Sequence, residues 1–310
     1  MSEPRMAWIA EDPASKTVED LAHKVADTST TLLIIGESGT GKDHLARLIH
    51  ELGPRRDAPF LKIDCASLPQ DLVESELFGH ERGAFTGAVE RKLGRLEMAQ
   101  GGTIVLDEVA ALSPATQAKL LRVLEERQFE RLGGTETITI SARLIALTNS
   151  DLARLVSEGQ FREDLFFRLS VLTISVPALR ARPADILPLA DALLERAARV
   201  HGRAGMAFTE PVRHMLNAYA WPGNVRELKN SIERALVFSS GPMLAPQDFP
   251  ESVQRADTGQ GVALRSLEDI ERDAIRATLE ATHYKIGKSA AILGISRKTL
   301  LDKRKRFDLN

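Results

Sequence analysis

The sequence has little that a secreted or membrane-spanning protein would need. Its 310 residues include a single cysteine, Cys65, so no disulfide can form within the chain, which fits a reducing compartment. No apolar run approaches the roughly 18 residues that span a bilayer. The N-terminal segment MSEPRMAWIAEDPASK also lacks the apolar stretch of a signal peptide. The sequence therefore predicts a cytoplasmic protein without membrane contact.

A strong net charge is also absent, but the charges are unevenly distributed. Residues 264–310 hold 11 Lys and Arg against 7 Asp and Glu, whereas the preceding residues hold 30 against 36. A basic C-terminal segment on an acidic body suggests contact with nucleic acid. A solvated basic helix would give the same pattern, so charge alone leaves both interpretations open.

Short apolar segments alternate with helical patterns through the first 176 residues. Their continuous apolar character predicts buried strands of a parallel sheet covered on both faces. The expected strands are TLLII (31–35), FLKI (60–63), TIVL (103–106), RLIAL (143–147) and VLTISV (171–176). Ser113 as N-cap and Pro114 in the first turn mark one intervening helix. These elements predict a doubly wound α/β domain.

The strand pattern stops at Pro183, and three helical segments follow. ADILPLADALLERAARVHG ends at Gly202, TEPVRHMLNAY is capped by Thr209, and VRELKNSIERALVF follows a Trp-Pro-Gly turn. Residues 251–263 hold few large apolar side chains and two glycines, which favours a flexible linker. We therefore predict an α/β core over 1–177, a helical domain over 178–250, this linker, and a further domain over 264–310.

A glycine-rich loop connects the first expected strand to the helical stretch DHLARLIHEL. It reads Gly36-Glu37-Ser38-Gly39-Thr40-Gly41-Lys42. Glycines allow backbone N–H groups to face phosphates, the helix N-terminus adds a positive dipole end, and Lys42 suits the β- and γ-phosphates. Asp43 stands where most such loops place a Ser or Thr hydroxyl on magnesium. Its carboxylate adds negative charge beside the phosphates, so another group must compensate.

A second candidate segment is Gly101-Gly102-Thr103-Ile104-Val105-Leu106-Asp107-Glu108. Its strand delivers two carboxylates to the C-terminal edge of the sheet, where ligands bind in such folds. Asp107 would hold Mg²⁺ through water, and Glu108 would polarise the attacking water. A strand that ends in an acidic turn is common on its own. Together with the upstream glycine-rich loop, it predicts a site for ATP and Mg²⁺.

Between these segments lies a glycine-punctuated loop that carries an aromatic residue. It reads Gly83-Ala84-Phe85-Thr86-Gly87-Ala88 and ends the longer segment ESELFGHERGAFTGA. An exposed aromatic residue flanked by glycines suggests a mobile contact element, although a buried loop anchor would also fit.

That segment closely resembles the signature of the sigma-54-dependent transcriptional activators, which are AAA+ ATPases. Residues 83–88 match the family's GAFTGA loop without change, and the similarity runs from about residue 30 to the C-terminus. In the family, this loop contacts sigma-54 and transmits ATP-driven motion to it. The resemblance implies an AAA+ core with a helical lid and a homo-oligomeric ring, expected to be a hexamer. It implies the sigma-54 RNA polymerase holoenzyme and double-stranded enhancer DNA as partners.

The resemblance also assigns roles to individual residues. LIALTNSDL places Thr148 and Asn149 where the family senses the γ-phosphate, and WPGNVRELKN places Arg226 at the second sensor on a lid helix. FREDLFFRL places Arg162 and Arg168 at the two arginine-finger positions. Without the resemblance, two surface arginines in salt bridges would be the favoured interpretation.

Two acidic residues depart from the usual pattern to different degrees. The family usually has an acidic residue after the loop lysine, so Asp43 is a mild variation. Asp64, in KIDCASLP, stands where the family often has Asn, which is thought to hold the catalytic glutamate until the partner engages. An ionised Asp cannot donate a hydrogen bond to ionised Glu108, so we expect that switch to work differently here.

The C-terminal segment has the pattern of a helix-turn-helix. Ser266-Leu267-Glu268-Asp269 resembles a capping box, a second helix near 285–293 ends at Gly294, and Ser296 caps the basic helix RKTLLDKRKRF. The segment resembles the Fis-type DNA-binding domain, with Lys285 and Leu301 in place of a common Asn and a frequent aromatic. The expected DNA-binding residues are Ser296, Arg297, Lys298, Thr299, Lys303, Arg304 and Lys305.

Only about 30 residues precede the first expected strand, too few for the receiver or ligand-sensing domain of many relatives. We therefore expect regulation by a partner in trans, regulation by expression level, or no regulation at all. Two rival functions remain: a general AAA+ remodelling ATPase, and a DNA-binding regulator that uses nucleotide only as a ligand. The intact GAFTGA segment argues against the first. Asp107 and Glu108, with Arg162 and Arg168, argue against the second.

Overall fold

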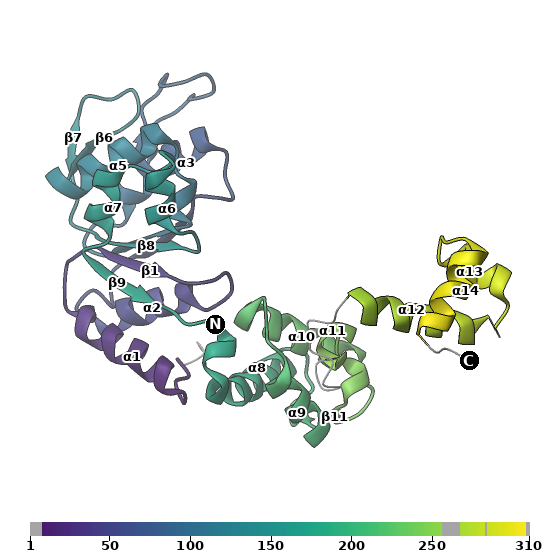
Figure 1. Cartoon of the computed structure of the whole chain (residues 1–310). Coiled ribbons are helices and arrows are strands. Elements are labelled where there is room, and N and C mark those ends of the chain that lie inside the picture. Colours follow the sequence, from purple (N-terminus) through teal and green to yellow (C-terminus); the bar gives the residue numbers. More distant parts are fainter. Residues whose placement is uncertain (1–7, 256–266, 283, 308–310) are drawn as a thin grey trace. The chain divides into compact units, whose positions relative to one another are not determined.

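The computed structural model describes residues 8–255, 267–282 and 284–307, and Figure 1 shows the order of its elements. The chain divides into two units, Met1–Asp257 and Thr258–Asn310. The first unit holds a sheet-based core and a helical lid, and the second is a small helical domain.

The core is built on a five-stranded parallel sheet in the order β2-β5-β8-β1-β9. The strands are β1 (Leu32–Ile35), β2 (Phe60–Asp64), β5 (Thr103–Asp107), β8 (Arg143–Thr148) and β9 (Leu172–Ser175). These are the five predicted strands, so the α/β prediction is confirmed. Because all strands run in one direction, the segments that follow β1, β5 and β8 meet at one edge of the sheet.

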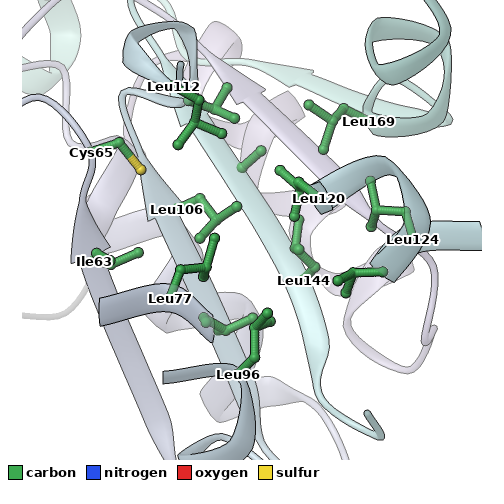
Figure 2. Close-up of a cluster of buried hydrophobic side chains, with 14 of the residues drawn as sticks. Ile63, Cys65, Leu77, Leu96, Leu106, Leu112, Leu120, Leu124, Leu144 and Leu169 are labelled. Atoms are coloured by element: carbon green, nitrogen blue, oxygen red, sulfur yellow. The ribbon is translucent and has the colours of Figure 1, made fainter. Parts of the chain in front are cut away.

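Both faces of the sheet are covered, as the continuous apolar strands predicted. Leu32 and Ile34 pack with residues of α1 (Pro13–Ala26) and α2 (Lys42–Leu52), whereas Leu33 packs on the opposite face. That face is covered by helices α3 (Gln70–Phe78), α4 (Arg95–Met98), α5 (Pro114–Glu126), α6 (Leu152–Ser157) and α7 (Glu163–Leu169). Figure 2 shows Leu106 and Leu144 of the sheet among Leu77, Leu96 and Leu120 of the helices. The alternation of strand side chains between two cores fixes the layer order.

Two antiparallel hairpins interrupt the α/β pattern. The first pairs β3 (Gly79–His80) with β4 (Lys92–Leu93), and the GAFTGA segment lies between these strands. The second pairs β6 (Gln128–Glu130) with β7 (Thr137–Thr139). Ser113 caps α5 by accepting a hydrogen bond from the Thr116 N–H, as predicted. The β6–β7 hairpin was not predicted, because its strands are too short to show a period.

The lid consists of helices α8 (Ile186–Val200), α9 (Glu210–Ala218), α10 (Asn224–Phe238) and α11 (Glu251–Gln254), with the short strands β10 (Ala207–Phe208) and β11 (Met243–Leu244). Its core surrounds Trp221, which is completely buried. Thr209 precedes α9 as predicted, but its hydroxyl bonds to the Leu244 carbonyl oxygen and does not cap the helix.

The predicted linker over 251–263 is wrong at its start. Residues 251–254 form α11, because Val253 is buried in the lid core and anchors this turn. Residues 256–263 lie outside the described part of the chain.

The second unit contains α12 (Leu267–Ala281), α13 (Ile286–Ile292) and α14 (Arg297–Arg306). Ile275, Leu279, Ala290 and Leu300 form its core, with Ile275 and Leu279 inward as the helical pattern suggested. Ser296 caps α14 through the Thr299 N–H, as predicted, whereas the expected cap residue Ser266 lies outside the described residues. Within the described residues, no helix has the length and apolar character needed to cross a membrane.

Candidate functional site

The glycine-rich loop Gly36–Lys42 links β1 to α2, so its amides lie at a helix N-terminus that favours anions. Gly39 and Gly41 adopt φ angles of +79° and +100°, which L side chains rarely tolerate. The buried Lys42 ammonium donates to the carbonyl oxygens of Gly36 at 2.8 Å and Glu37 at 3.2 Å. Burial lowers the pKa of Lys42, and the nearby carboxylates of Glu108, Asp107 and Asp43 oppose this shift.

The lid lies directly on this loop. The Val225 N–H donates to the Gly39 carbonyl oxygen at 3.0 Å, and the Arg226 guanidinium donates to the Ser38 hydroxyl at 2.7 Å. Asn224 is fully buried at a φ of 53°, and its amide donates to the Ser38 carbonyl oxygen at 3.0 Å. Arg226 therefore lies against the loop, and its role as the second sensor stays a prediction.

Glu37 forms a second connection between loop and lid. The Arg180 guanidinium bonds to both Glu37 oxygens, one of them at 2.8 Å, and the Asn224 amide adds a bond at 3.1 Å. These bonds, first from Arg180 and then from Asn224, lower the pKa of Glu37 to about 2. Sequence reasoning missed Arg180 and Asn224, because their partner is more than 140 residues away along the chain.

The carboxylates of Asp107 and Glu108, at the end of β5, have different partners. Glu108 adopts a left-handed backbone conformation, with φ 53° and ψ 54°, and such strain concentrates at functional sites. Its carboxylate accepts a hydrogen bond from the Asn149 N–H at 3.1 Å, which joins the ends of β5 and β8. Thr148 is fully buried, and its hydroxyl accepts from the Ser150 N–H at 3.0 Å. Glu108 and Asn149 are thus brought together at the sheet edge.

Asp107 lies in a charge cluster that sequence reasoning did not find. The Lys62 ammonium on β2 lies 2.6 Å from an Asp43 oxygen and 2.7 Å from an Asp107 oxygen. Partial burial alone would lower the pKa of Lys62, but its hydrogen bonds to Asp107 and Asp43 outweigh burial and raise it. Lys62 is the compensating charge that Asp43 requires. The sequence signal that could have revealed this ion pair is Lys62 itself, a charged residue in the middle of the otherwise apolar strand FLKI.

Asp64 stabilises a turn. Its carboxylate accepts hydrogen bonds from the backbone N–H groups of Ala66 at 3.0 Å and Ser67 at 3.1 Å. An Asp side chain performs this role well, because a carboxylate is an acceptor only. Glu108, by contrast, is held through the Asn149 backbone amide.

Arg162 and Arg168 lie at the ends of the short helix α7. Arg162 pairs with Asp164, with an N–O distance of 2.7 Å, and this pair is exposed. The Arg168 guanidinium donates to the Leu124 carbonyl oxygen of α5 at 3.1 Å. Both arginines therefore have partners on α5 or α7 of their own chain.

A hollow of about 740 Å³ is lined by residues of the loop, of the end of β8 and of the lid, among them Ser38, Asn149 and Arg226. A second hollow of about 540 Å³ is lined by Trp8, which stacks on His44 with the ring centroids 5.9 Å apart. In the part of the chain that the structure describes, no three His, Cys, Asp or Glu side chains converge to hold a metal ion.

The segment 83–88 forms a hydrogen-bonded turn at the tip of the first hairpin. The Gly83 N–H donates to the Ala88 carbonyl oxygen at 2.8 Å, and the Ala88 N–H donates to the Phe85 carbonyl oxygen at 3.0 Å. Phe85 is 42% exposed, and its ring meets the His80 ring in an edge-to-face contact. Thr86 is exposed as well. The aromatic residue is thus displayed and not buried as an anchor.

The β6–β7 hairpin supports this turn. The buried Arg131 donates to Glu97 at 2.7 Å, Glu81 at 2.9 Å and Glu136 at 2.9 Å. The hydrogen bonds to Glu97, Glu136 and Glu81 outweigh the effect of burial and raise the pKa of Arg131. Gly133 has no room for a Cβ, which would lie 2.8 Å from the Ala84 Cβ. The two hairpins are therefore closely packed at the base of the turn.

The basic residues of α14 are not equivalent. Lys303 forms an ion pair with Glu271 at 2.6 Å, so this predicted DNA-binding residue has a partner within its own unit. Arg304 lies over the Tyr284 ring, 5.6 Å from the centroid. Arg297, Lys298 and Lys305 are exposed, and Lys285 occupies the N-cap position of α13.

The fold and site define an AAA+ protein: a phosphate loop at the edge of a parallel sheet, a helical lid on that loop, and a helix-turn-helix unit. Comparison with known families agrees. Residues 8–175 match the sigma-54 interaction domain, residues 180–265 the AAA+ ATPase lid domain, and residues 266–307 the bacterial regulatory proteins of the Fis family. The chain belongs to the family of sigma-54-dependent transcriptional activators.

Individual relatives place the similarity along nearly the whole chain. The transcriptional regulatory protein ZraR of Klebsiella oxytoca is 44% identical, with 97% of this chain and 69% of ZraR covered. The nitrogen fixation protein AnfA of Azotobacter vinelandii is 43% identical, with 94% of this chain and 56% of AnfA covered. The chain thus spans between about half and two thirds of these relatives.

Solved structures of NtrX from Brucella abortus share the fold. One covers 97% of this chain and 69% of NtrX with a TM-score of 0.77 at 34% identity. The NtrX complex with ATP covers 98% of this chain with a TM-score of 0.76 at 33% identity.

Proposed function

We propose that this protein binds enhancer DNA, assembles into a ring, and uses ATP hydrolysis to open promoter complexes of the sigma-54 RNA polymerase holoenzyme. The observation that carries the proposal is one unit that combines a lid-covered phosphate loop with an intact, exposed GAFTGA turn. An NtrX relative has been solved with ATP, which supports the same ligand for this site. We expect this activity in the cytoplasm.

The phosphate loop would bind the triphosphate through its amides and Lys42, which must leave the carbonyl oxygens of Gly36 and Glu37 to do so. Asp107 would hold Mg²⁺ through water, and this ion neutralises developing phosphate charge when bound. Glu108 would accept a proton from the attacking water, held in line by the Asn149 backbone. Arg226 would contact the phosphates from the lid. The hollow beside Trp8 and Val225 suits the base.

Arg162 and Arg168 would act on the nucleotide of a neighbouring subunit. Arg162 is paired with Asp164 and Arg168 with the Leu124 carbonyl oxygen, so both guanidinium groups have partners other than the loop of their own chain, which supports a role in trans. Arginines supplied in this way raise hydrolysis rates by about 10³–10⁵. The ring, for which we propose a hexamer, would place each pair at a subunit boundary.

Mixing two inactive variants tests this arrangement. Arg168→Ala should bind ATP but hydrolyse it poorly, because its neighbours lack the arginine. Mixed rings with Lys42→Ala should recover part of the ATPase activity, since intact loops then meet intact arginines. No recovery at any ratio, in rings shown to contain both variants by native mass spectrometry, would contradict catalysis in trans.

DNA binding would reside in α13 and α14, whose exposed basic side chains suit phosphate contacts. The whole proposal is tested by open-complex formation at a sigma-54 promoter with an upstream site. The chain should open the promoter with ATP but not with ADP, and a chain that ends at residue 263 should keep ATPase activity while losing site-specific DNA binding. ATP hydrolysis without any promoter opening would favour a general remodelling ATPase. Promoter regulation without turnover would favour nucleotide as a ligand.

A further inference from the structure

The Lys62 cluster contains a single cation between two carboxylates that flank the proposed phosphate site. Asp43 follows Lys42 in the first turn of α2, and Asp107 ends β5. Lys62 lies on the edge strand β2, opposite Val105 in the parallel register, and its ammonium reaches both acids at 2.6 and 2.7 Å. Three different elements are therefore joined through one ammonium group.

Lys42 does not take this place. Its ammonium donates to two carbonyl oxygens inside the loop. Asp107 is only 17% exposed on its side chain and Lys62 35%, so their attraction is less screened than that of a surface pair. Without Lys62, Asp43 and Asp107 would keep only the more distant charge of Lys42 nearby, and they would repel an incoming triphosphate more strongly.

We propose that Lys62 is a positioning residue whose ammonium neutralises Asp43 and Asp107 until nucleotide and Mg²⁺ bind. This inference rests on the nucleotide site of the proposed function. The ammonium keeps the site from repelling phosphate, and it also disfavours a divalent cation that arrives alone. Mg²⁺ is therefore admitted together with the nucleotide, whose phosphates supply the additional oxygen ligands.

The charges predict opposite effects on two ligands when Lys62 is removed. Lys62→Met should weaken the binding of ATP in EDTA by about fivefold to tenfold, because the two carboxylates then repel the phosphates. The same variant should bind Mn²⁺ in the absence of nucleotide several-fold more tightly than wild type. A residue that only stabilises the fold would lower both affinities or neither.

The experiment measures both affinities on the full chain, by calorimetry for ATP in EDTA and by electron paramagnetic resonance for free Mn²⁺. Lys119→Met is the matched control, because Lys119 pairs with Glu74 at a similarly exposed position elsewhere on the core. Lys62→Arg should restore wild-type values, and adding Asp43→Asn to Lys62→Met should recover most of the ATP affinity. Thermal melting identifies any variant that is unfolded. If Lys62→Met is unfolded, Lys62→Arg and the double variant test the inference in its place.

The inference is supported if Lys62→Met lowers the ATP affinity and raises the Mn²⁺ affinity while Lys119→Met changes neither. Equal values for the two variants in either measurement overturn it. Failure of the wild-type chain to bind ATP under any condition would instead contradict the proposed nucleotide site. The Mn²⁺ measurement needs no nucleotide, so it tests Lys62 even then.

Discussion

The phosphate loop and the GAFTGA turn are both rich in glycine, but they use glycine for different reasons. At Gly39, an added Cβ would lie 2.4 Å from the Gly223 carbonyl oxygen of the lid, so that glycine permits a close approach of two backbones. At Gly83 and Gly87, an added Cβ would meet no atom within 4 Å, and only the positive φ angles of +81° and +104° favour glycine. One loop is enclosed by its own chain, whereas the other is left open.

This difference indicates where each loop finds its partner. The enclosed loop is positioned by Asn224, Val225 and Arg226, so its geometry is set by contacts within the unit. The open turn is supported at its base by Arg131, while Phe85 and Thr86 stay exposed at its tip. Substitutions in the first loop should therefore change nucleotide chemistry, and those at the tip of the second should change partner binding alone.

The largest expected effect is that of Lys42→Ala on nucleotide binding. The variant should lose about a hundredfold or more in ATP affinity, because a charged hydrogen-bond donor to the phosphates is removed from a buried position. Calorimetry measures this loss, with the exposed Lys16→Ala as a control for the loss of one positive charge. Equal ATP affinity in wild type and Lys42→Ala would show that the phosphates bind elsewhere.

A smaller and more selective effect is expected from adding one methyl group to each loop. Both Gly39→Ala and Gly87→Ala force a left-handed backbone on alanine, which costs about 1–2 kcal/mol. Only Gly39→Ala also pushes against the lid. It should therefore lower Tm further than Gly87→Ala, by several degrees, since each kcal/mol lowers Tm by about 2–4 °C in a domain of this size.

The two variants should also separate in function. Gly39→Ala should weaken ATP binding, because the lid can no longer rest on the loop, whereas Gly87→Ala should leave ATP affinity unchanged. Thermal melting with and without nucleotide measures both quantities. Similar losses of stability and of ATP affinity in the two variants would remove the distinction between an enclosed and an open loop.

The sequence predicted the features that depend on short segments. The five strands, the phosphate loop and the acidic pair are each contained in fewer than ten residues with a clear pattern. The family resemblance additionally placed Arg226 on a lid helix, and the structure adds its hydrogen bond to the distant residue Ser38.

The features that were missed depend on residues far apart. Arg180 reaches Glu37 across 143 positions, and Lys62 joins residues of α2 and β5, so neither pairing leaves a local pattern. Lys303 is among the predicted DNA-binding residues, and its ion pair with Glu271, which forms when α12 and α14 pack together, leaves no local pattern either. The hydroxyl of Thr209 bonds to Leu244 in place of the helix amides, which a capping pattern cannot foresee.

In the proposed function, the exposed GAFTGA turn transmits the energy of ATP hydrolysis to sigma-54, and the substitution Thr86→Ala separates this coupling from hydrolysis itself. Thr86 is exposed in the segment between β3 and β4 and belongs to neither the phosphate loop nor the lid, so ATPase rate and ring assembly should stay near wild type. Sigma-54 binding in a transition-state-like nucleotide complex should be lost, and open-complex formation with it. Promoter opening by Thr86→Ala at the wild-type rate would show that the turn does not couple ATP hydrolysis to sigma-54.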